Sequence, residues 1–268
     1  MTPVVKSARL STGVTLPYAE QGDRAGIPVL FLHGVTDSFH SFDLVLPHLS
    51  PRIRAFAVTQ RGHGDAEKPE RGYRAADFAA DVPAFLDAVG LSSAVVVGHS
   101  MGGTNAQRLA IDHPKRVRGL VLAGSFAGYR DKPEMVEFEQ AVAALVDPLD
   151  PGFVREFQET TVARPVAPEY LDLVVRESLK VPARVWRATF AAFLDDECTA
   201  ELGRITAPTL VLWGSRDAFA SRADQDALLA AIRGARLVVY EGAGHALHWE
   251  EPKRFAADVE AFAAACTA

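Results

Sequence analysis

Short apolar runs alternate along the chain with longer stretches in which apolar residues recur at helical spacing. Short runs rich in Val and Leu are typical of strands that are buried on both faces of a sheet. The stretches between them are long enough for parallel crossover connections, so the pattern predicts an α/β protein with a mostly parallel sheet covered by helices. The predicted buried strands are 29–33, 54–59, 94–98, 117–123, 209–213 and 236–240.

Three stretches predict helices outside the middle of the chain. Residues 75–89 carry apolar side chains at helical spacing with acidic residues on the other face, and 101–112 and 251–266 are also predicted to be helical. Near the N-terminus, segments 6–10 and 14–20 flank a Ser-Thr-Gly turn and predict a hairpin.

Between residues 125 and 202 the strand pattern disappears and helical segments take its place. We therefore expect a core built from 1–124 and 203–268, and a helical cap formed by 125–202 that is inserted between the two halves of one sheet. Prolines separate the helical segments of this insertion, at Pro133, Pro148, Pro151, Pro165, Pro168 and Pro182.

Composition narrows the class of protein. The chain has 28 Lys and Arg against 34 Asp and Glu, a formal charge of −6, which argues against a nucleic-acid partner. No apolar run has the length of a membrane span and no secretion signal is legible, so we expect a cytoplasmic protein with no membrane partner. Cys198 and Cys266 lie too far apart to indicate a disulfide framework or a zinc ribbon.

The sequence Gly-His-Ser-Met-Gly-Gly at 98–103 lies between a predicted strand and a predicted helix. Gly-x-Ser-x-Gly in this context is a nucleophile elbow, whose central residue projects above the sheet. Gly98 and Gly102 are needed because strand and helix nearly touch there and a Cβ would collide. Ser100 is the candidate nucleophile. The alternative is a chance turn of glycine and serine.

A serine hydroxyl needs a base to take its proton, and the chain has eight histidines. His245 follows the last predicted strand in Gly-Ala-Gly-His, at the sheet edge where α/β proteins place their sites. His245-x-x-His248 resembles a metal pair, but no third ligand accompanies it, so we expect no metal. We expect His33, His63 and His99 to bond loop backbone, and His40, His48 and His113 to lie at the surface or at an interface.

The base needs a carboxylate to hold its tautomer. Asp217 follows the strand 209–213, which gives the chain order Ser, Asp, His expected for this architecture. The rival position, after 117–123, holds no carboxylate. A helix cap or an ion pair with Arg216 is the alternative role for Asp217.

Backbone amides complete the predicted site. Gly34 follows the strand 29–33 and lets the chain turn, so that the Val35 N–H can point at the site. Together with the Met101 N–H it would give an oxyanion hole with two donors.

With these motifs the chain resembles the α/β-hydrolase superfamily along nearly its whole length, and in particular its small bacterial esterases, lactonases and carbon–carbon bond hydrolases. The resemblance implies an eight-stranded, mostly parallel sheet flanked by helices, with a helical cap after the sixth strand. The matching motifs are His33-Gly34, Arg61-Gly62-His63-Gly64, Gly98 to Gly103, Trp213-Gly214-x-x-Asp217 and Gly242-x-Gly244-His245-x-x-x-Trp249-Glu250-Glu251-Pro252.

Position by position, the resemblance implies that Ser100 is the nucleophile, His245 the base and then the acid, and Asp217 the orienting carboxylate. Val35 and Met101 would supply the oxyanion hole. The residues that support this site would be His33, Gly34, Gly98 and Gly102.

The chain departs from the family pattern at two places. Thr59 stands where an Asp usually precedes the Arg-Gly-x-Gly loop by two residues, and Ala218 stands where a Pro often follows the acid. Neither position belongs to the triad, so the departures concern loop shape and the lining of the pocket. Ser100 also excludes relatives that use an aspartate at the elbow, such as epoxide hydrolases and haloalkane dehalogenases.

These observations predict hydrolysis of a small ester or lactone without a cofactor, by a monomer or small homo-oligomer. The insertion carries seven Phe and Trp side chains, most of which we expect to form its own core, and the rest predict an uncharged, apolar substrate. These seven are Phe126, Phe138, Phe153, Phe157, Trp186, Phe190 and Phe193. One alternative is a carbon–carbon bond hydrolase of ring-fission dienoates, with a cap arginine for the substrate carboxylate. The candidate arginines are Arg155, Arg164, Arg176, Arg184 and Arg187. The other alternative is a ligand receptor on the same fold.

Overall fold

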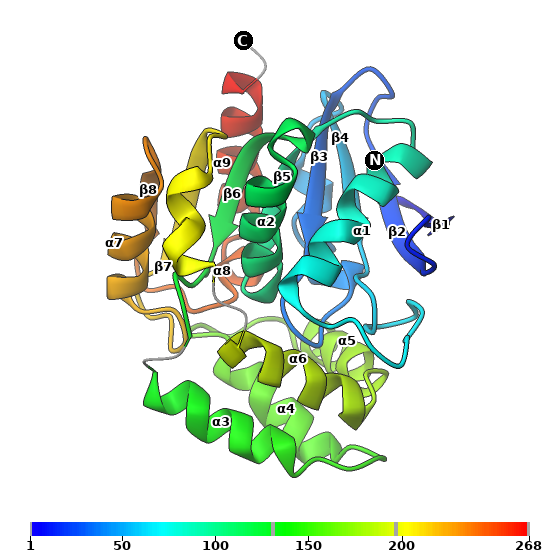
Figure 1. Ribbon diagram of the computed structural model, residues 1–268, viewed down its shortest axis with the longest axis vertical. Coiled ribbons are helices and arrows are strands. Elements are labelled where there is room, and N and C mark those ends of the chain that lie inside the picture. Colours follow the sequence, from blue (N-terminus) through cyan, green and yellow to red (C-terminus); the bar gives the residue numbers. More distant parts are fainter. Residues whose placement is uncertain (1, 130–131, 196–197, 267–268) are drawn as a thin grey trace.

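Eight strands form one sheet in the computed structural model, which describes residues 2–129, 132–195 and 198–266 (Figure 1). The strand order is β1-β2-β4-β3-β5-β6-β7-β8. β1 pairs antiparallel with β2 and β2 antiparallel with β4, while the other neighbours are parallel. The strands are β1 (Val4–Arg9), β2 (Thr15–Gln21), β3 (Ile27–Leu32), β4 (Ile53–Val58), β5 (Ala94–His99), β6 (Val117–Ala123), β7 (Thr209–Gly214) and β8 (Arg236–Tyr240).

The six predicted buried strands and the N-terminal hairpin are confirmed, with ends shifted by at most two residues. The three predicted helices outside the insertion are confirmed as well. The helices are α1 (Ala75–Ala88), α2 (Met101–Asp112), α3 (Pro133–Ala143), α4 (Pro151–Thr160), α5 (Pro168–Leu179), α6 (Ala183–Asp195), α7 (Arg222–Ala231), α8 (Leu247–Glu250) and α9 (Pro252–Ala265).

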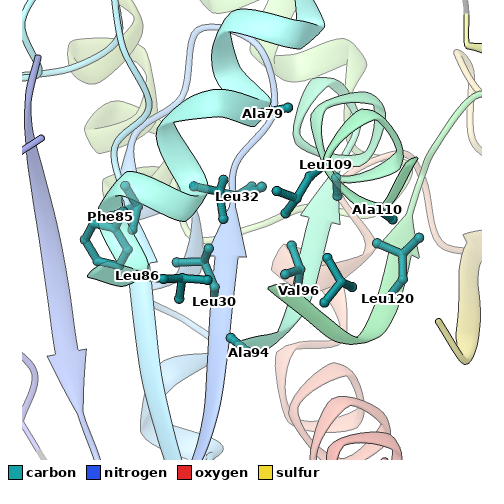
Figure 2. Close-up of a cluster of buried hydrophobic side chains, with 14 of the residues drawn as sticks. Leu30, Leu32, Ala79, Phe85, Leu86, Ala94, Val96, Leu109, Ala110 and Leu120 are labelled. Atoms are coloured by element: carbon teal, nitrogen blue, oxygen red, sulfur yellow. The ribbon is translucent and has the colours of Figure 1, made fainter. Parts of the chain in front are cut away.

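Side chains alternate between the two faces of the sheet and build a separate core on each. On one face, Leu30 and Leu32 of β3 are buried with side chains of α1, α2 and α7, and on the other Val29 and Phe31 are buried with side chains of α9. Both sides of the central strands are therefore apolar, which explains their continuous hydrophobic runs. Figure 2 shows the first core, in which the strand residues Leu30, Leu32, Val96 and Leu120 meet Ala79, Phe85, Leu86, Leu109 and Ala110 of the helices.

Helices α3 to α6 lie together at one end of the sheet, between β6 and β7 in the chain (Figure 1). We call them the cap helices. They share an aromatic cluster with core residues that include Met101 and Tyr73, and Trp186 is completely buried in it. The division into a core of 1–124 and 203–268 and a cap of 125–202 remains our proposal.

Candidate active site

Ser100 stands at the turn between β5 and α2. Its φ of 52° and ψ of −118° lie where residues with a Cβ are rarely found, at a cost of about 1–3 kcal/mol that the surroundings must offset. A Cβ on Gly98 would lie 2.3 Å from the carbonyl oxygen of Gly102, and one on Gly102 would lie 2.2 Å from that of Leu32. The chain therefore has the tight strand-to-helix turn that the motif predicts.

His245 and Asp217 are brought together from the ends of β8 and β7. The imidazole Nδ1 lies 2.9 Å from Asp217 Oδ2 and 3.0 Å from Oδ1, and the two side chains are only 6% and 0% exposed. The backbone N–H groups of Phe219 and Ala220 donate to Asp217 Oδ1. The side chain that caps α7 is Ser221. Because Nδ1 is held by the carboxylate, Nε2 is the nitrogen that can exchange a proton with a substrate or a nucleophile.

Ser100, His245 and Val35 line one cavity of about 380 Å³, including the open space at its mouth, which we call the inner cavity. Five of the seven Phe and Trp residues that we singled out in the insertion line it, and the same five side chains also pack in the apolar cluster of the cap, so they form both cap core and cavity wall. Helical spacing reveals an apolar face but not whether that face meets other side chains or a cavity. These five are Phe126, Phe138, Phe157, Phe190 and Phe193.

A wider cavity of about 1060 Å³, including the open space at its mouth, adjoins the inner one. Glu156 and Lys132 stand on its wall, and Lys132 forms an ion pair with Asp224 while its ammonium lies over the Phe126 ring. The two cavities share four apolar wall residues, which are Met135, Phe138, Phe157 and Phe219. We call this second space the outer cavity.

Two of the buried histidines hold the loops of the site. Burial lowers the pKa of His33 and of His99 well below its usual range, so both rings are neutral at pH 7. His33 Nδ1 donates to the Gly34 carbonyl oxygen at 2.7 Å, and its Nε2 accepts from the Gln60 N–H at 2.9 Å. His99 Nε2 lies 3.1 Å from the carbonyl oxygen of His245. Both rings thus bond loop backbone, as the sequence predicts.

His248 is a buried structural residue in this arrangement. Burial lowers its pKa to about 3, and its Nε2 lies 3.1 Å from Ser41 Oγ. Among the residues that the structure describes, no cluster of three or more His, Cys, Asp or Glu side chains is arranged to hold a metal ion.

Three buried residues near the site were not singled out by sequence reasoning. Thr36 follows Val35 and has a φ of 70°. Asp37 is 3% exposed, and burial raises the pKa of its carboxyl group to about 7. Gln158, on α4, donates from Nε2 to Asp37 Oδ1 at 3.0 Å. Asp37 and Ser41 follow the His33-Gly34 motif and are four residues apart, as on one face of a helix, which is only a weak sequence signal for a shared role. Gln158 belongs to no motif.

A family model described as the alpha/beta hydrolase fold matches residues 27–252, and the chain belongs to the α/β-hydrolase family. It is 32% identical to a non-heme chloroperoxidase of Streptomyces lividans over 94% of this chain and 97% of that protein. It is 37% identical to a 2-(acetamidomethylene)succinate hydrolase of Mesorhizobium japonicum, in a match that spans 52% of this chain and about half, 49%, of that protein.

Solved structures agree with the family assignment. An esterase from Rhodococcus sp. ECU1013 superposes with a TM-score of 0.85 at 26% identity, covering 97% of this chain and 98% of that one. The resemblance and the fold class inferred from the motifs are thereby confirmed. Within the described residues, no helix is both long and apolar enough to cross a membrane.

Proposed function

We propose that the protein is a serine hydrolase that cleaves carboxylic esters or lactones through an acyl-enzyme. The observation that carries the proposal is the hydrogen-bonded pair of His245 and Asp217 in the cavity that Ser100 also lines. A strained serine, a histidine base and a buried carboxylate are the parts that acyl transfer needs. The likeness to an esterase of known structure supports the same reaction.

In this reaction Ser100 Oγ attacks the carbonyl carbon of the substrate while His245 Nε2 takes its proton. The resulting imidazolium is stabilised by Asp217, and the Val35 and Met101 N–H groups donate to the oxyanion. Collapse of the tetrahedral intermediate breaks the bond to the leaving alcohol, which takes the proton from His245. Water, deprotonated by the same base, then attacks the acyl-enzyme, and the bond to Ser100 Oγ breaks as His245 returns the proton to that oxygen, which frees the acid.

The wall of the inner cavity favours an uncharged, apolar substrate. None of the described residues on the inner wall is a carboxylate, a lysine or an arginine. Four of the five candidate arginines are bonded elsewhere, and Arg176 is exposed on α5. This makes the dienoate hydrolase the weaker hypothesis, because its substrate carboxylate needs a cation. The engaged arginines are Arg155 with Asp172, Arg164 with Glu251, Arg184 with the Pro69 and Lys68 carbonyl groups, and Arg187 with the Leu145 carbonyl group.

The test compares the wild-type protein with Ser100→Ala on a panel of substrates. The panel holds p-nitrophenyl acetate and butyrate, a neutral lactone, a ring-fission dienoate, and a chlorination assay prompted by the Streptomyces relative. We expect ester or lactone turnover that Ser100→Ala reduces by about 10⁴-fold or more.

Ser93→Ala is the matched control, because Ser93 precedes β5 while Ser100 follows it, and its hydroxyl accepts a bond from Arg118. It should keep wild-type rates. Ester turnover that survives in Ser100→Ala contradicts the proposed nucleophile. Turnover of the dienoate alone contradicts the proposed substrate class, and stoichiometric labelling without steady-state turnover favours the receptor.

A further inference from the structure

One side chain of the cap reaches the loop that carries Val35. Gln158 lies in the last turn of α4 and is 1% exposed. Its Nε2 is 3.0 Å from Asp37 Oδ1, 3.2 Å from Thr36 Oγ1 and 2.8 Å from Ser178 Oγ. Three buried oxygens, from the Val35 loop and from α5, thus lie within hydrogen-bond distance of an amide nitrogen that has two N–H donors.

The loop that Gln158 contacts is strained at the residue after Val35. Thr36 has a φ of 70° and is completely buried, and a residue with a branched Cβ adopts this conformation only when its surroundings impose it. The side-chain partners of its hydroxyl are Gln158 Nε2 and Ser178 Oγ, the latter at 3.2 Å. Both belong to cap helices, so the cap contributes to holding the backbone that orients the Val35 N–H.

The same network continues to the loop that carries His245. Asp37 Oδ2 accepts from Ser41 Oγ at 3.0 Å, and Ser41 Oγ lies 3.1 Å from His248 Nε2. The centroids of the His248 and His99 rings lie 4.4 Å apart, and His99 Nε2 bonds the carbonyl oxygen of His245. A chain of buried contacts therefore joins the two loops of the proposed site.

The end of α4 also contacts the histidine loop directly. The carbonyl oxygen of Thr161 accepts from the Ala246 N–H at 2.8 Å. Ala163 N–H donates to Glu250 Oε1 at 2.8 Å, and the same oxygen accepts from the Gly244 N–H at 2.9 Å. One short segment of the cap, residues 158–163, is thus bonded to both catalytic loops.

We propose that Gln158 is a positioning residue, which holds Thr36 and Asp37 so that the Val35 N–H is aimed at the oxyanion. The proposal rests on the proposed function, because it assigns Gln158 a part in the same acyl transfer. It requires no contact between Gln158 and the substrate. The cap then contributes to the transition state as well as to the walls of the substrate cavity.

The test replaces the amide by a side chain of similar length without donors, Gln158→Met. Misplacing a donor that acts mainly in the transition state lowers kcat more than it changes KM. We expect kcat for p-nitrophenyl butyrate to fall by about 10- to 100-fold, with KM within about twofold of wild type. The affinity for an alkyl boronic acid, which forms a tetrahedral adduct, should weaken in proportion to kcat/KM.

A double-mutant cycle with Thr36→Gly separates positioning from general support. Glycine adopts a φ of 70° without strain, so a loop with glycine at position 36 should need less support from Gln158. Gln158→Met should then lower kcat less in this background. We expect the fold-loss in kcat caused by Gln158→Met to be several times smaller in the Thr36→Gly background. An equal loss in both backgrounds contradicts the role assigned to Gln158.

Arg184→Met is the control for a loosened cap, because Arg184 bonds α6 to the Pro69 and Lys68 carbonyl groups, away from the Val35 loop. It should leave kcat unchanged, and an equal loss there overturns the proposal. A rise in KM at constant kcat in Gln158→Met overturns it as well. If the wild type hydrolyses esters and Gln158→Met is equally active, only this inference is refuted. If the wild type is inactive on esters, the proposed function is refuted.

Should Gln158→Met fail to fold, as circular dichroism and the melting temperature would show, Ser178→Ala provides the milder variant. It removes one acceptor of Gln158 and one neighbour of Thr36 while keeping the amide on Asp37. We expect a loss of severalfold in kcat at constant KM. Wild-type kcat in a folded Ser178→Ala then counts against the proposal.

Discussion

Replacing Asp37 with asparagine should change how the stability of the protein depends on pH. Asp37 is 3% exposed, and burial raises the pKa of its carboxyl group from 3.8 to about 7. Hydrogen bonds from Gln158 and Ser41 and the nearby His245 ring act in the opposite direction, and Glu177 raises the pKa further. The folded protein therefore keeps a proton on Asp37 that the unfolded chain has already lost.

The sign follows from the number of protons bound in each state. For a carboxyl group whose pKa is raised by folding, the stabilising contribution is complete below the unfolded pKa and is lost as pH rises toward the folded one. Each pH unit in this window is worth about 1.4 kcal/mol. Because this slope is reached only between the two pKa values, the wild type should lose about 3 kcal/mol of unfolding free energy through Asp37 alone between pH 4 and pH 7.

Asparagine has the same shape and does not titrate. Its Oδ1 can accept from Gln158, and its Nδ2 can donate to Ser41 Oγ. The unfolding free energy of Asp37→Asn relative to wild type should therefore rise by about 3 kcal/mol from pH 4 to pH 7 and stay level above about pH 8. Urea denaturation at half-unit pH intervals measures this difference. Asp65→Asn, at a side chain that is 72% exposed, controls for the loss of one surface charge.

A relative stability that stays constant across this pH range would refute the reasoning, because it would mean that Asp37 has the same proton affinity in both states. A rise of similar size in Asp65→Asn would also refute it, since the effect would then come from net charge and not from burial.

Two further substitutions test the geometry of the site. Asp217→Asn should lower kcat for p-nitrophenyl butyrate by about 10⁴-fold, because the wrong His245 tautomer is favoured, and wild-type kcat would place the acid elsewhere. Gly102→Ala puts a Cβ 2.2 Å from the Leu32 carbonyl oxygen and should cost at least about 3 kcal/mol in urea denaturation. Gly203→Ala, where the nearest contact is 3.7 Å, should change stability little, and equal losses in the two variants would contradict the steric argument.

Local signals account for the parts of the protein that the sequence predicts well. Strands buried on both faces need unbroken apolar runs, which is why β5 and β6 are visible without any knowledge of their neighbours. The turn at Ser100 is equally local, because glycines two residues away on either side allow the strand and the helix to approach without a Cβ clash. The position of Asp217 and His245 follows from a rule about strand ends, and it needs only the order of the strands.

The lining of the cavity and the support of the Val35 loop depend on contacts between distant segments. The sequence pattern of a helix with an apolar face is the same whether that face covers a core or a cavity. The place of Phe157 and Phe190 on the cavity wall is therefore visible only in the folded structure. Gln158 and Asp37 are 121 residues apart, and a polar residue in the last turn of a helix usually faces water. Its burial is decided by the approach of α4 to the loop after β3.

Strain marks the two positions where the proposed oxyanion donors are set. Among the described residues, Thr36 and Ser100 are the non-glycine residues with a positive φ, and one follows Val35 while the other precedes Met101. The turn at Ser100 is made possible by Gly98 and Gly102, which both belong to the core. The turn at Thr36 is supported through side chains of α4 and α5. If both donors are needed for acyl transfer, the Met101 donor of the oxyanion hole depends on glycines of the core, and the Val35 donor depends on side chains of the cap. Changes in the cap should then alter turnover as well as the choice of substrate.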